Sequence, residues 1–281
     1  MITIHVAENT PSGEYNLAAV TPPVIPIPQP VLRYPTGKGY YVWIVKQCRN
    51  GDIAAIVDSC LEAKINFLAV KIQNGTAGYN TNSPLSRLFL ALNSAGVKVW
   101  GWGYEYAIKP RDEALAAAKY TKDLGVEGFI IDIEGEYKNK PSESRTFCDT
   151  LKENLDKPIG LASYRYPNLH MDISWNTFLS ICDFHNPQVY WQGATLPSSP
   201  SQQLKKSIVQ LKALRDLPVI PIGVASPSDP PSTWVPTVAQ IKDFYHAAFA
   251  VEKCPGACYW SWQHAEKVQA WWDAIAAPLW G

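Results

Sequence analysis

The residues from Gly128 to Glu136 combine an apolar run with closely spaced carboxylates. The segment reads Gly-Phe-Ile-Ile-Asp-Ile-Glu-Gly-Glu, which predicts a short buried strand that ends in acid. Because side chains on a strand alternate between its two faces, Ile130, Asp132 and Glu134 point the same way. Two neighbouring carboxylates are costly to bury, so folding alone gives little reason for them. Cleavage of a glycosidic bond does give a reason, because it needs one protonated carboxyl and one charged carboxyl.

The charge of the chain indicates no affinity for nucleic acid or for an anionic membrane, since 25 Lys and Arg residues balance 25 Asp and Glu residues. No apolar run reaches membrane-spanning length. Residues 1–15 lack the basic start and the apolar core of a signal peptide. We therefore expect neither nucleic acid nor a membrane as a partner. Carriage by a phage, or export with a partner protein, would suit a chain of this kind; its localisation and oligomeric state stay open.

The aromatic residues and the cysteines add two expectations. With 11 Trp and 14 Tyr, most rings are expected in the core, and some are expected to line a sugar-binding cleft. The six cysteines are scattered, and only Cys254 and Cys258 are close in sequence. A lone pair with this spacing lacks the second pair that zinc needs, so we expect buried thiols or one local disulfide. No metal site and no cofactor are predicted.

The order of the predicted elements favours a (β/α)₈ barrel of the TIM type. Residues 1–36 include a proline-rich stretch and are predicted to form an extended N-terminal segment, followed by one barrel domain over 37–281. From residue 39 onward, apolar strand-like runs alternate with helix-like runs, which implies a parallel sheet. Eight such units in roughly 240 residues match a TIM barrel. An open doubly wound sheet is the competing architecture, but no glycine-rich phosphate loop follows the first strand.

The expected elements can be given by their bounds. Strands are predicted over 40–45, 67–73, 97–104, 128–134, 158–163, 187–192, 219–224 and 257–262. Helices are predicted over 52–63, 84–95, 111–124, 143–154, 175–182, 202–214, 238–250 and 265–277.

Polar and aromatic residues gather at the predicted carboxyl ends of these strands, which is where TIM barrels hold their active sites. Strand ends meet solvent, so some polar residues are expected there in any case. The concentration of Tyr, Trp and acid exceeds that expectation, and we interpret this rim as functional. A structural ion pair between Asp132 and Lys71 is the alternative role for the aspartate. The rim residues singled out beside the two acids are Lys71, Gln73, Tyr104, Glu136, Tyr190, Gln192, Trp260 and Trp262.

These motifs resemble two families of barrel glycosidases. The segments 66–79, 95–104, 189–192 and 259–263 are similar to strands two, three, six and eight of family 25 lysozymes. The Asp-x-Glu pair with its preceding residues, together with Tyr190 and a tryptophan of the last strand, resembles family 18 chitinases more weakly. The chain departs from family 25 in two places: strand one carries no acid, and Asn74 stands where that family has Glu.

The resemblance implies a retaining glycosidase that acts next to an N-acetylated sugar, in a polysaccharide such as peptidoglycan or chitin. In both families the acetamido group of the substrate serves as the internal nucleophile. Glu134 would be the general acid, and Asp132 would orient the acetamido group and favour the protonated form of Glu134. Tyr190 would support the acetamido oxygen, and Trp262 or Trp260 would form the floor under the reacting sugar. Further substrate-binding roles fall to Tyr104, Lys71, Gln73, Gln192 and Glu136, the last with a loop role favoured.

Two other functions compete with this one. A non-catalytic carbohydrate-binding barrel, as part of a cell-surface or phage particle, is supported by the missing acid on strand one. A magnesium enzyme would use Asp132, Glu134 and Glu136 as oxygen ligands. Such a site should recruit acids from several strands, and the other strand ends offer only Glu105.

Overall fold

The computed structural model describes residues 32–192, 199–227 and 233–277, and within them the predicted TIM barrel is confirmed. Eight parallel strands close into a ring, because β1 pairs with β2 at one side and with β9 at the other. The ring strands are β1 (Gly37–Val42), β2 (Phe67–Asn74), β4 (Lys98–Tyr104), β5 (Phe129–Asp132), β6 (Ile159–Tyr164), β7 (Phe184–Gln188), β8 (Ile222–Val224) and β9 (Gly256–Trp260). The short β3 (Ala77–Gly78) folds back on the end of β2 in antiparallel pairing.

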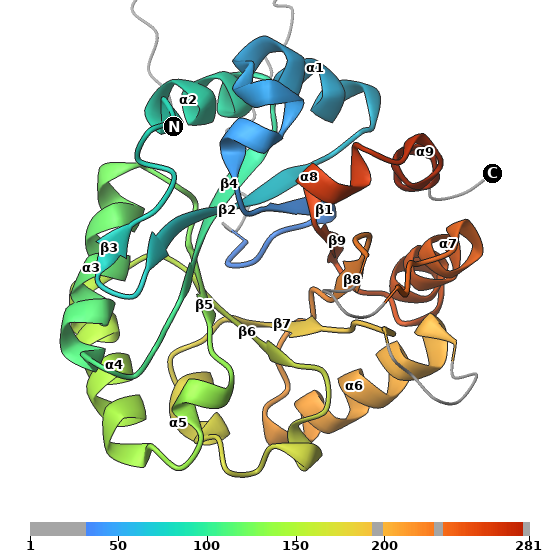
Figure 1. The fold of residues 1–281 in the computed structure, drawn as a ribbon. Coiled ribbons are helices and arrows are strands. Elements are labelled where there is room, and N and C mark those ends of the chain that lie inside the picture. Colours follow the sequence, from blue (N-terminus) through green and yellow to red (C-terminus); the bar gives the residue numbers. More distant parts are fainter. Residues whose placement is uncertain (1–31, 193–198, 228–232, 278–281) are drawn as a thin grey trace, which may run out of the picture. The chain divides into compact units, whose positions relative to one another are not determined.

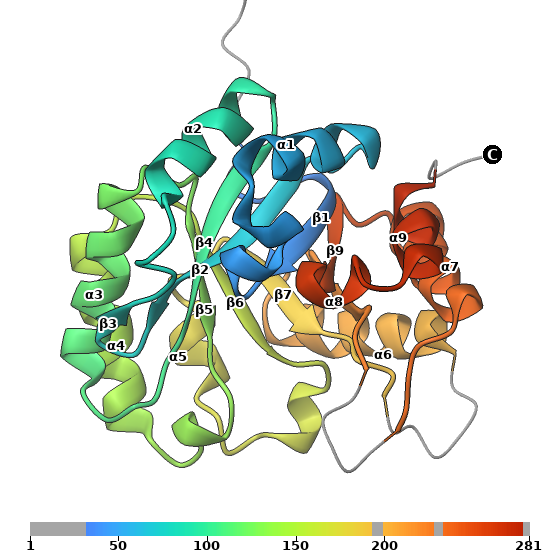
Figure 2. The same cartoon turned by 45° about the horizontal axis from the view of Figure 1, so that its top comes forward.

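Helices surround the ring of strands in both views of the molecule (Figures 1 and 2). They are α1 (Ile53–Glu62), α2 (Leu85–Ser94), α3 (Pro110–Asp123), α4 (Pro141–Asn154), α5 (Trp175–Leu179), α6 (Pro200–Leu214), α7 (Val238–His246), α8 (Trp262–Ala265) and α9 (Gln269–Ala276). Proline occupies the first turn of α3, α4 and α6, where a missing N–H costs nothing. The predicted N-terminal segment over 1–36 falls mostly outside the described residues.

Aromatic rings close the lower end of the barrel interior, which is the end at the amino termini of the strands. Phe67, Trp100 and Phe184 are almost fully buried there, and the rings of Trp100 and Phe184 meet edge to face with centroids 5.3 Å apart. The neighbouring strand carries Gly160 beside Phe184, and a Cβ at that glycine would lie 2.2 Å from the phenylalanine ring. Gly39 faces Phe67 in the same way. These glycines exist because the rings need the space of the missing side chains.

A polar link crosses the middle of the interior. The Tyr41 hydroxyl donates a short hydrogen bond to Asn186, whose amide donates in turn to the carbonyl of Ile220. Burial raises the pKa of Tyr41 well above its usual value, so this hydroxyl keeps its proton and acts as a donor. Each polar group of the link therefore has a partner despite its burial, as buried polar groups require.

Several predicted strands have different bounds in the structure: β1 covers Gly37–Val42 rather than 40–45, and β8 covers Ile222–Val224 rather than 219–224. Two further differences bear on the site. The predicted strand 187–192 is wrong in position: β7 begins at Phe184 and ends at Gln188. The polar residues His185 and Asn186 interrupt the apolar run, although both are buried in the strand. The last strand, β9, ends at Trp260 rather than at residue 262, because Trp262 begins the short helix α8. These shifts decide which side chains reach the mouth of the barrel.

Two further findings concern the cysteines and the helices. All six cysteines are free and buried, Cys254 and Cys258 included. Burial raises the pKa of the Cys254 thiol to about 12, so it stays protonated and unreactive. In the described part of the chain, no helix has both the length and the apolar character that a membrane span requires.

Candidate active site

A cavity of about 280 Å³ opens at the carboxyl ends of the barrel strands. It lies above the aromatic closure of the interior, and all eight ring strands or the residues just after them contribute to its wall. Such a concave, largely apolar cavity with a few converging polar groups is typical of a ligand site. Its lining consists of Tyr41, Trp43, Lys71, Trp102, Tyr104, Asp132, Glu134, Ala162, Gln188, Tyr190, Ile222 and Trp260.

The two acids of the sequence motif meet in this cavity, as the alternation of β5 predicts. Asp132 is the last residue of β5 and is only 7% exposed, whereas Glu134 is half-buried. One side-chain amide joins them: Nε2 of Gln188 donates to Oδ1 of Asp132 at 3.1 Å and to Oε1 of Glu134 at 3.0 Å. The two accepting oxygens therefore lie no more than 6.1 Å apart, the sum of these two distances.

Asp132, the more buried of the two acids, has a pKa shifted by its surroundings. Burial raises the pKa of Asp132 well above its usual value, and the charge of Glu134 adds to this effect, whereas Lys71 and Gln188 oppose it. The aspartate therefore favours its protonated form in the free protein. Ionising Asp132 is costly because it lies beside a second carboxylate with little access to solvent.

Lys71 brings a cation to the same cavity without an ion pair. Burial lowers the pKa of its amine to about 8, although the charges of Asp132 and Glu105 act in the opposite direction. Its Nζ lies 4.6 Å from the ring centre of Tyr79 and 4.9 Å from that of Trp102. Among the ion pairs of the described residues, none joins Lys71 to Asp132, so the alternative of a structural ion pair receives no support. The amine is instead held by aromatic faces.

Two tyrosines of the cavity wall lie near the acid pair. Burial raises the pKa of Tyr190 well above its usual value, and the nearby charges of Asp132 and Glu134 add to this. Its phenol therefore remains a hydrogen-bond donor at any physiological pH. Burial also raises the pKa of Tyr104, whose hydroxyl donates to Oε2 of Glu136 at 2.6 Å. Glu136 thus holds a wall residue in place and does not itself line the cavity.

Aromatic rings form the remaining wall. The ring of Trp260 lies 6.0 Å from that of Trp43, 5.7 Å from that of Trp102 and 6.0 Å from that of Tyr41, measured between centroids. Trp260 is the last residue of β9, and the peptide bond that joins it to Ser261 is cis. This cluster offers flat apolar surface in the cavity wall, which suits the apolar face of a sugar ring.

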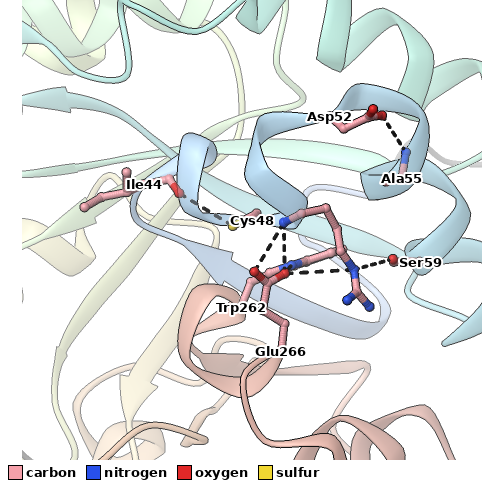
Figure 3. Close-up of polar contacts among 8 residues, drawn as sticks. Ile44, Cys48, Asp52, Ala55, Ser59, Trp262 and Glu266 are labelled. Atoms are coloured by element: carbon pink, nitrogen blue, oxygen red, sulfur yellow. Dashed lines mark hydrogen bonds and ion pairs between the residues drawn. The ribbon is translucent and has the colours of Figure 1, made fainter.

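Besides Glu136, three predicted site residues lie away from the cavity. Trp262 is fully buried in the outer layer, where its indole nitrogen donates to Glu266 at 2.7 Å (Figure 3). Gln73 is also fully buried and donates to Oε2 of Glu105 at 3.1 Å, outside the cavity. Gln192 lies four residues beyond the end of β7 and is not among the lining residues.

The structure adds residues that the sequence motifs did not single out, namely Gln188, Trp43 and Trp102. Gln188 is the most informative, because its side-chain amide donates hydrogen bonds to both acids. The alternation along strand six could have found it, since Gln188 shares a face with Tyr190. Within the described ranges, no group of three His, Cys, Asp or Glu side chains is arranged to hold a metal ion.

Comparisons with known proteins give a similarity of fold. No protein-family model and no curated protein matches the chain. Among solved structures, it is similar to a family 18 chitinase from Pseudoalteromonas aurantia, with a TM-score of 0.61 and 14% identity over 86% of this chain and 99% of that one. The spore cortex-lytic enzyme SleL of Bacillus cereus has a TM-score of 0.62 and 8% identity over 85% and 73% of the two chains.

A third similar structure is not described as an enzyme. The xylanase and alpha-amylase inhibitor protein XAIP-II from Scadoxus multiflorus has a TM-score of 0.57 and 17% identity, over 86% of this chain and 98% of that one. At such identities the similarity shows the barrel fold and nothing finer. The function therefore has to be argued from the side chains in the cavity.

Proposed function

We propose that this protein is a glycoside hydrolase that cleaves a glycan containing N-acetylhexosamine, of the chitin or peptidoglycan type, with retention of configuration. The observation that carries the proposal is the acid pair at the mouth of the barrel. Asp132 and Glu134 share the amide of Gln188 and face a wall of tryptophans. The chitinase and the cortex-lytic enzyme among the similar structures add support from the fold.

The spacing of the two acids favours retention. In inverting glycosidases the two carboxyl groups stand roughly 6.5–9.5 Å apart, which leaves room for a water molecule on the far side of the sugar. The two bridged oxygens here lie at most 6.1 Å apart, the sum of the 3.0 and 3.1 Å hydrogen bonds. Both acids also belong to the same strand end. An acetamido group of the substrate would then supply the nucleophile.

The proposed reaction begins with a proton on the deeper acid. An acetamido N–H that donates to Asp132 would stabilise its carboxylate, and its proton would pass to Glu134 within the pair. Glu134 would then give this proton to the glycosidic oxygen as that oxygen leaves the anomeric carbon. The acetamido oxygen would form the new bond to that carbon, with its position held by the Tyr190 hydroxyl.

Water completes the proposed reaction. The Glu134 carboxylate would take a proton from a water molecule that attacks the anomeric carbon and opens the cyclic intermediate. The sugar leaves with its original configuration, and Glu134 is again protonated. Trp260, rather than the deeply buried Trp262, has the exposure to the cavity that the floor of the sugar site requires.

The test of this proposal is the substitution Glu134→Gln, which keeps the shape of the side chain but removes its proton transfer. We expect the rate on N-acetylglucosamine oligomers or on peptidoglycan to fall by about 10²–10⁴-fold, the usual contribution of a general acid. Glu136→Gln is the matched control, because Glu136 lies two residues away and outside the cavity. Full activity in Glu134→Gln, or an equal loss in both variants, would rule out this mechanism.

A non-catalytic carbohydrate-binding barrel is the second candidate. Two observations favour it: strand β1 carries no acid, and an inhibitor protein is among the similar structures. Binding of an oligosaccharide by the wild-type protein, with no product released over long incubation, would identify this function. In that case Glu134→Gln would alter affinity only.

A further inference from the structure

A second cavity, of about 290 Å³, adjoins the candidate active site. Gln188 and Tyr190 line both cavities, so the two cavities meet at these side chains. The other residues of interest in its wall are Tyr164, Arg165 and Tyr166, which end or follow β6, and His170. A glycan cut at Glu134 must continue on both sides of the broken bond, and this cavity offers space for its continuation.

Arg165 gives this cavity a cation without an acidic partner. The side chain is half-buried, and burial lowers its pKa, with only Tyr166 acting in the opposite direction. The guanidinium carbon lies 5.1 Å from the ring centre of Tyr166. Among the described residues, no carboxylate forms an ion pair with Arg165. A half-buried guanidinium in a cavity wall without an anion is costly, and a bound carboxylate would offset that cost.

The charges around this cavity leave Arg165 as its one uncompensated cation among the described lining residues. His170 stacks on Tyr164 with ring centroids 3.7 Å apart, and burial lowers its pKa, so its ring is neutral near pH 7. Lys138 lies near Tyr164 but is paired with Asp172 at 3.4 Å. The positive charge is therefore concentrated where Arg165 lines the wall.

We infer that the second cavity is a subsite for a sugar carrying a carboxylate, which Arg165 recognises. This inference rests on the proposed function, because it places a glycan across the acid pair. It narrows the substrate class from N-acetylhexosamine glycans in general to anionic ones. The carboxylate has two sources in a peptidoglycan-like polymer: an acidic substituent on the sugar itself, or a peptide attached to that substituent.

The test compares three tetrasaccharides of similar backbone. One is the neutral oligomer of N-acetylglucosamine, one alternates N-acetylglucosamine with N-acetylmuramic acid bearing a free carboxylate, and one carries stem peptides on that carboxylate. Affinities are measured by calorimetry with Glu134→Gln, with and without Arg165→Gln. We expect Arg165→Gln to weaken binding of a carboxylated oligomer by about 10- to 100-fold, as for a lost charge-assisted hydrogen bond, and to affect the neutral oligomer far less.

Lys206→Gln is the matched control. Lys206 places its amine 4.5 Å from the same ring, that of Tyr166, but it is exposed and does not line the cavity. It should leave all three affinities near their reference values. If Arg165→Gln does not fold, the affinity ratio of carboxylated to neutral oligomer is followed with salt in protein that keeps Arg165. That ratio should fall as ionic strength approaches about 1 M, where the Debye length is roughly 3 Å.

The outcomes separate this inference from the proposed function. Equal weakening of neutral and carboxylated oligomers by Arg165→Gln, or no preference for a carboxylate with Arg165 present, would overturn the subsite. Preference for the free acid assigns the carboxylate to the sugar, and preference for the third oligomer assigns it to the peptide. If wild-type protein binds with the expected preference but releases no product, the subsite stands and the hydrolase proposal fails. If the protein cleaves the oligomers without preferring a carboxylate, the hydrolase proposal stands and the subsite fails.

Discussion

The two ends of the barrel interior are built on opposite principles. The lower end contains rings that fit against glycines, as Phe184 fits against Gly160, with hardly any exposed surface. The mouth contains Asp132 and Lys71, which are also buried but ionisable. Burial favours the neutral form of each group, because it raises the pKa of the acid and lowers the pKa of the amine. The lower end therefore stabilises the fold, whereas the buried ionisable groups at the mouth cost stability, as the proposed catalytic function would require.

This comparison predicts that the largest loss of stability comes from the lower end. Phe184→Ala should lower the free energy of unfolding by about 3–5 kcal/mol, because it leaves a cavity among fully buried rings. Glu134→Gln at the mouth should change that free energy little while removing activity. Urea unfolding of the two variants measures the contrast. A larger loss of stability in Glu134→Gln than in Phe184→Ala would break the comparison.

The fit between ring and glycine gives a second, smaller effect at the same end. Gly160→Ala places a Cβ within 2.2 Å of the Phe184 ring, and such overpacking should cost about 1–3 kcal/mol. In the double variant with Phe184→Ala, the added methyl group enters the space that the ring has left. The double variant should therefore be more stable than the sum of the single changes predicts. Strict additivity would mean that Gly160 is not required by the ring.

At the mouth, the comparison predicts a change of stability with pH. The pKa of Asp132 is raised above its unfolded value near 3.8, so the folded state keeps this proton longer than the unfolded state. The contribution of this proton to the free energy of unfolding is fully present below the unfolded pKa. It is lost as pH rises toward the folded pKa, by up to about 1.4 kcal/mol per pH unit. Asp132→Asn lacks this loss, so its stability relative to wild type should increase with pH above about 4.

Urea unfolding of Asp132→Asn and wild type at several pH values measures this effect. Glu105→Gln is an informative companion, since Glu105 is fully buried and burial raises its pKa as well. It should show the same trend without a direct contact to the proposed substrate. A stability difference for Asp132→Asn that is independent of pH would mean that its carboxyl is ionised in the folded protein throughout.

The same contrast explains what the sequence could predict. The eight strands and the inward placement of Asp132 follow from local alternation, which the barrel preserves. Gln73 is predicted in the cavity but lies outside it, because the register of β2 shifts between Lys71 and Gln73 and these residues no longer share a face. Trp262 was grouped with Trp260 because no sequence signal marks the residue at which β9 gives way to helix α8.

The sequence motifs also do not indicate Gln188, whose amide binds both acids, and the reason is again the position of a strand. A predicted strand that starts at Pro187 has Gln192 at its carboxyl end, so the sequence indicates Gln192 rather than Gln188 as a site residue. The true strand starts three residues earlier, which makes Gln188 its last residue and places its amide between the acids. Strand positions within a barrel depend on pairing with neighbours, and a single sequence carries little of that information.

The smallest expected effect concerns Lys71. Its pKa is lowered to about 8 by burial, so its positive charge is present at neutral pH and is lost as pH rises through that value. Because this charge favours the ionised form of Asp132, which must accept the acetamido N–H, kcat/KM should decline by roughly threefold to tenfold above pH 8. Lys71→Met should remove this alkaline decline.

Lys38 provides the matched control for that decline. Burial also lowers its pKa to about 8, but its amine donates to the carbonyls of Ile275 and Ala276 at the far C-terminal helix, not at the cavity. Lys38→Met should therefore reduce stability and leave the shape of the pH profile of kcat/KM unchanged. If the alkaline decline persists in Lys71→Met and disappears in Lys38→Met, the buried charge at the mouth serves packing rather than catalysis. In that case Lys71 at the mouth would have a structural role, like the residues at the lower end of the barrel.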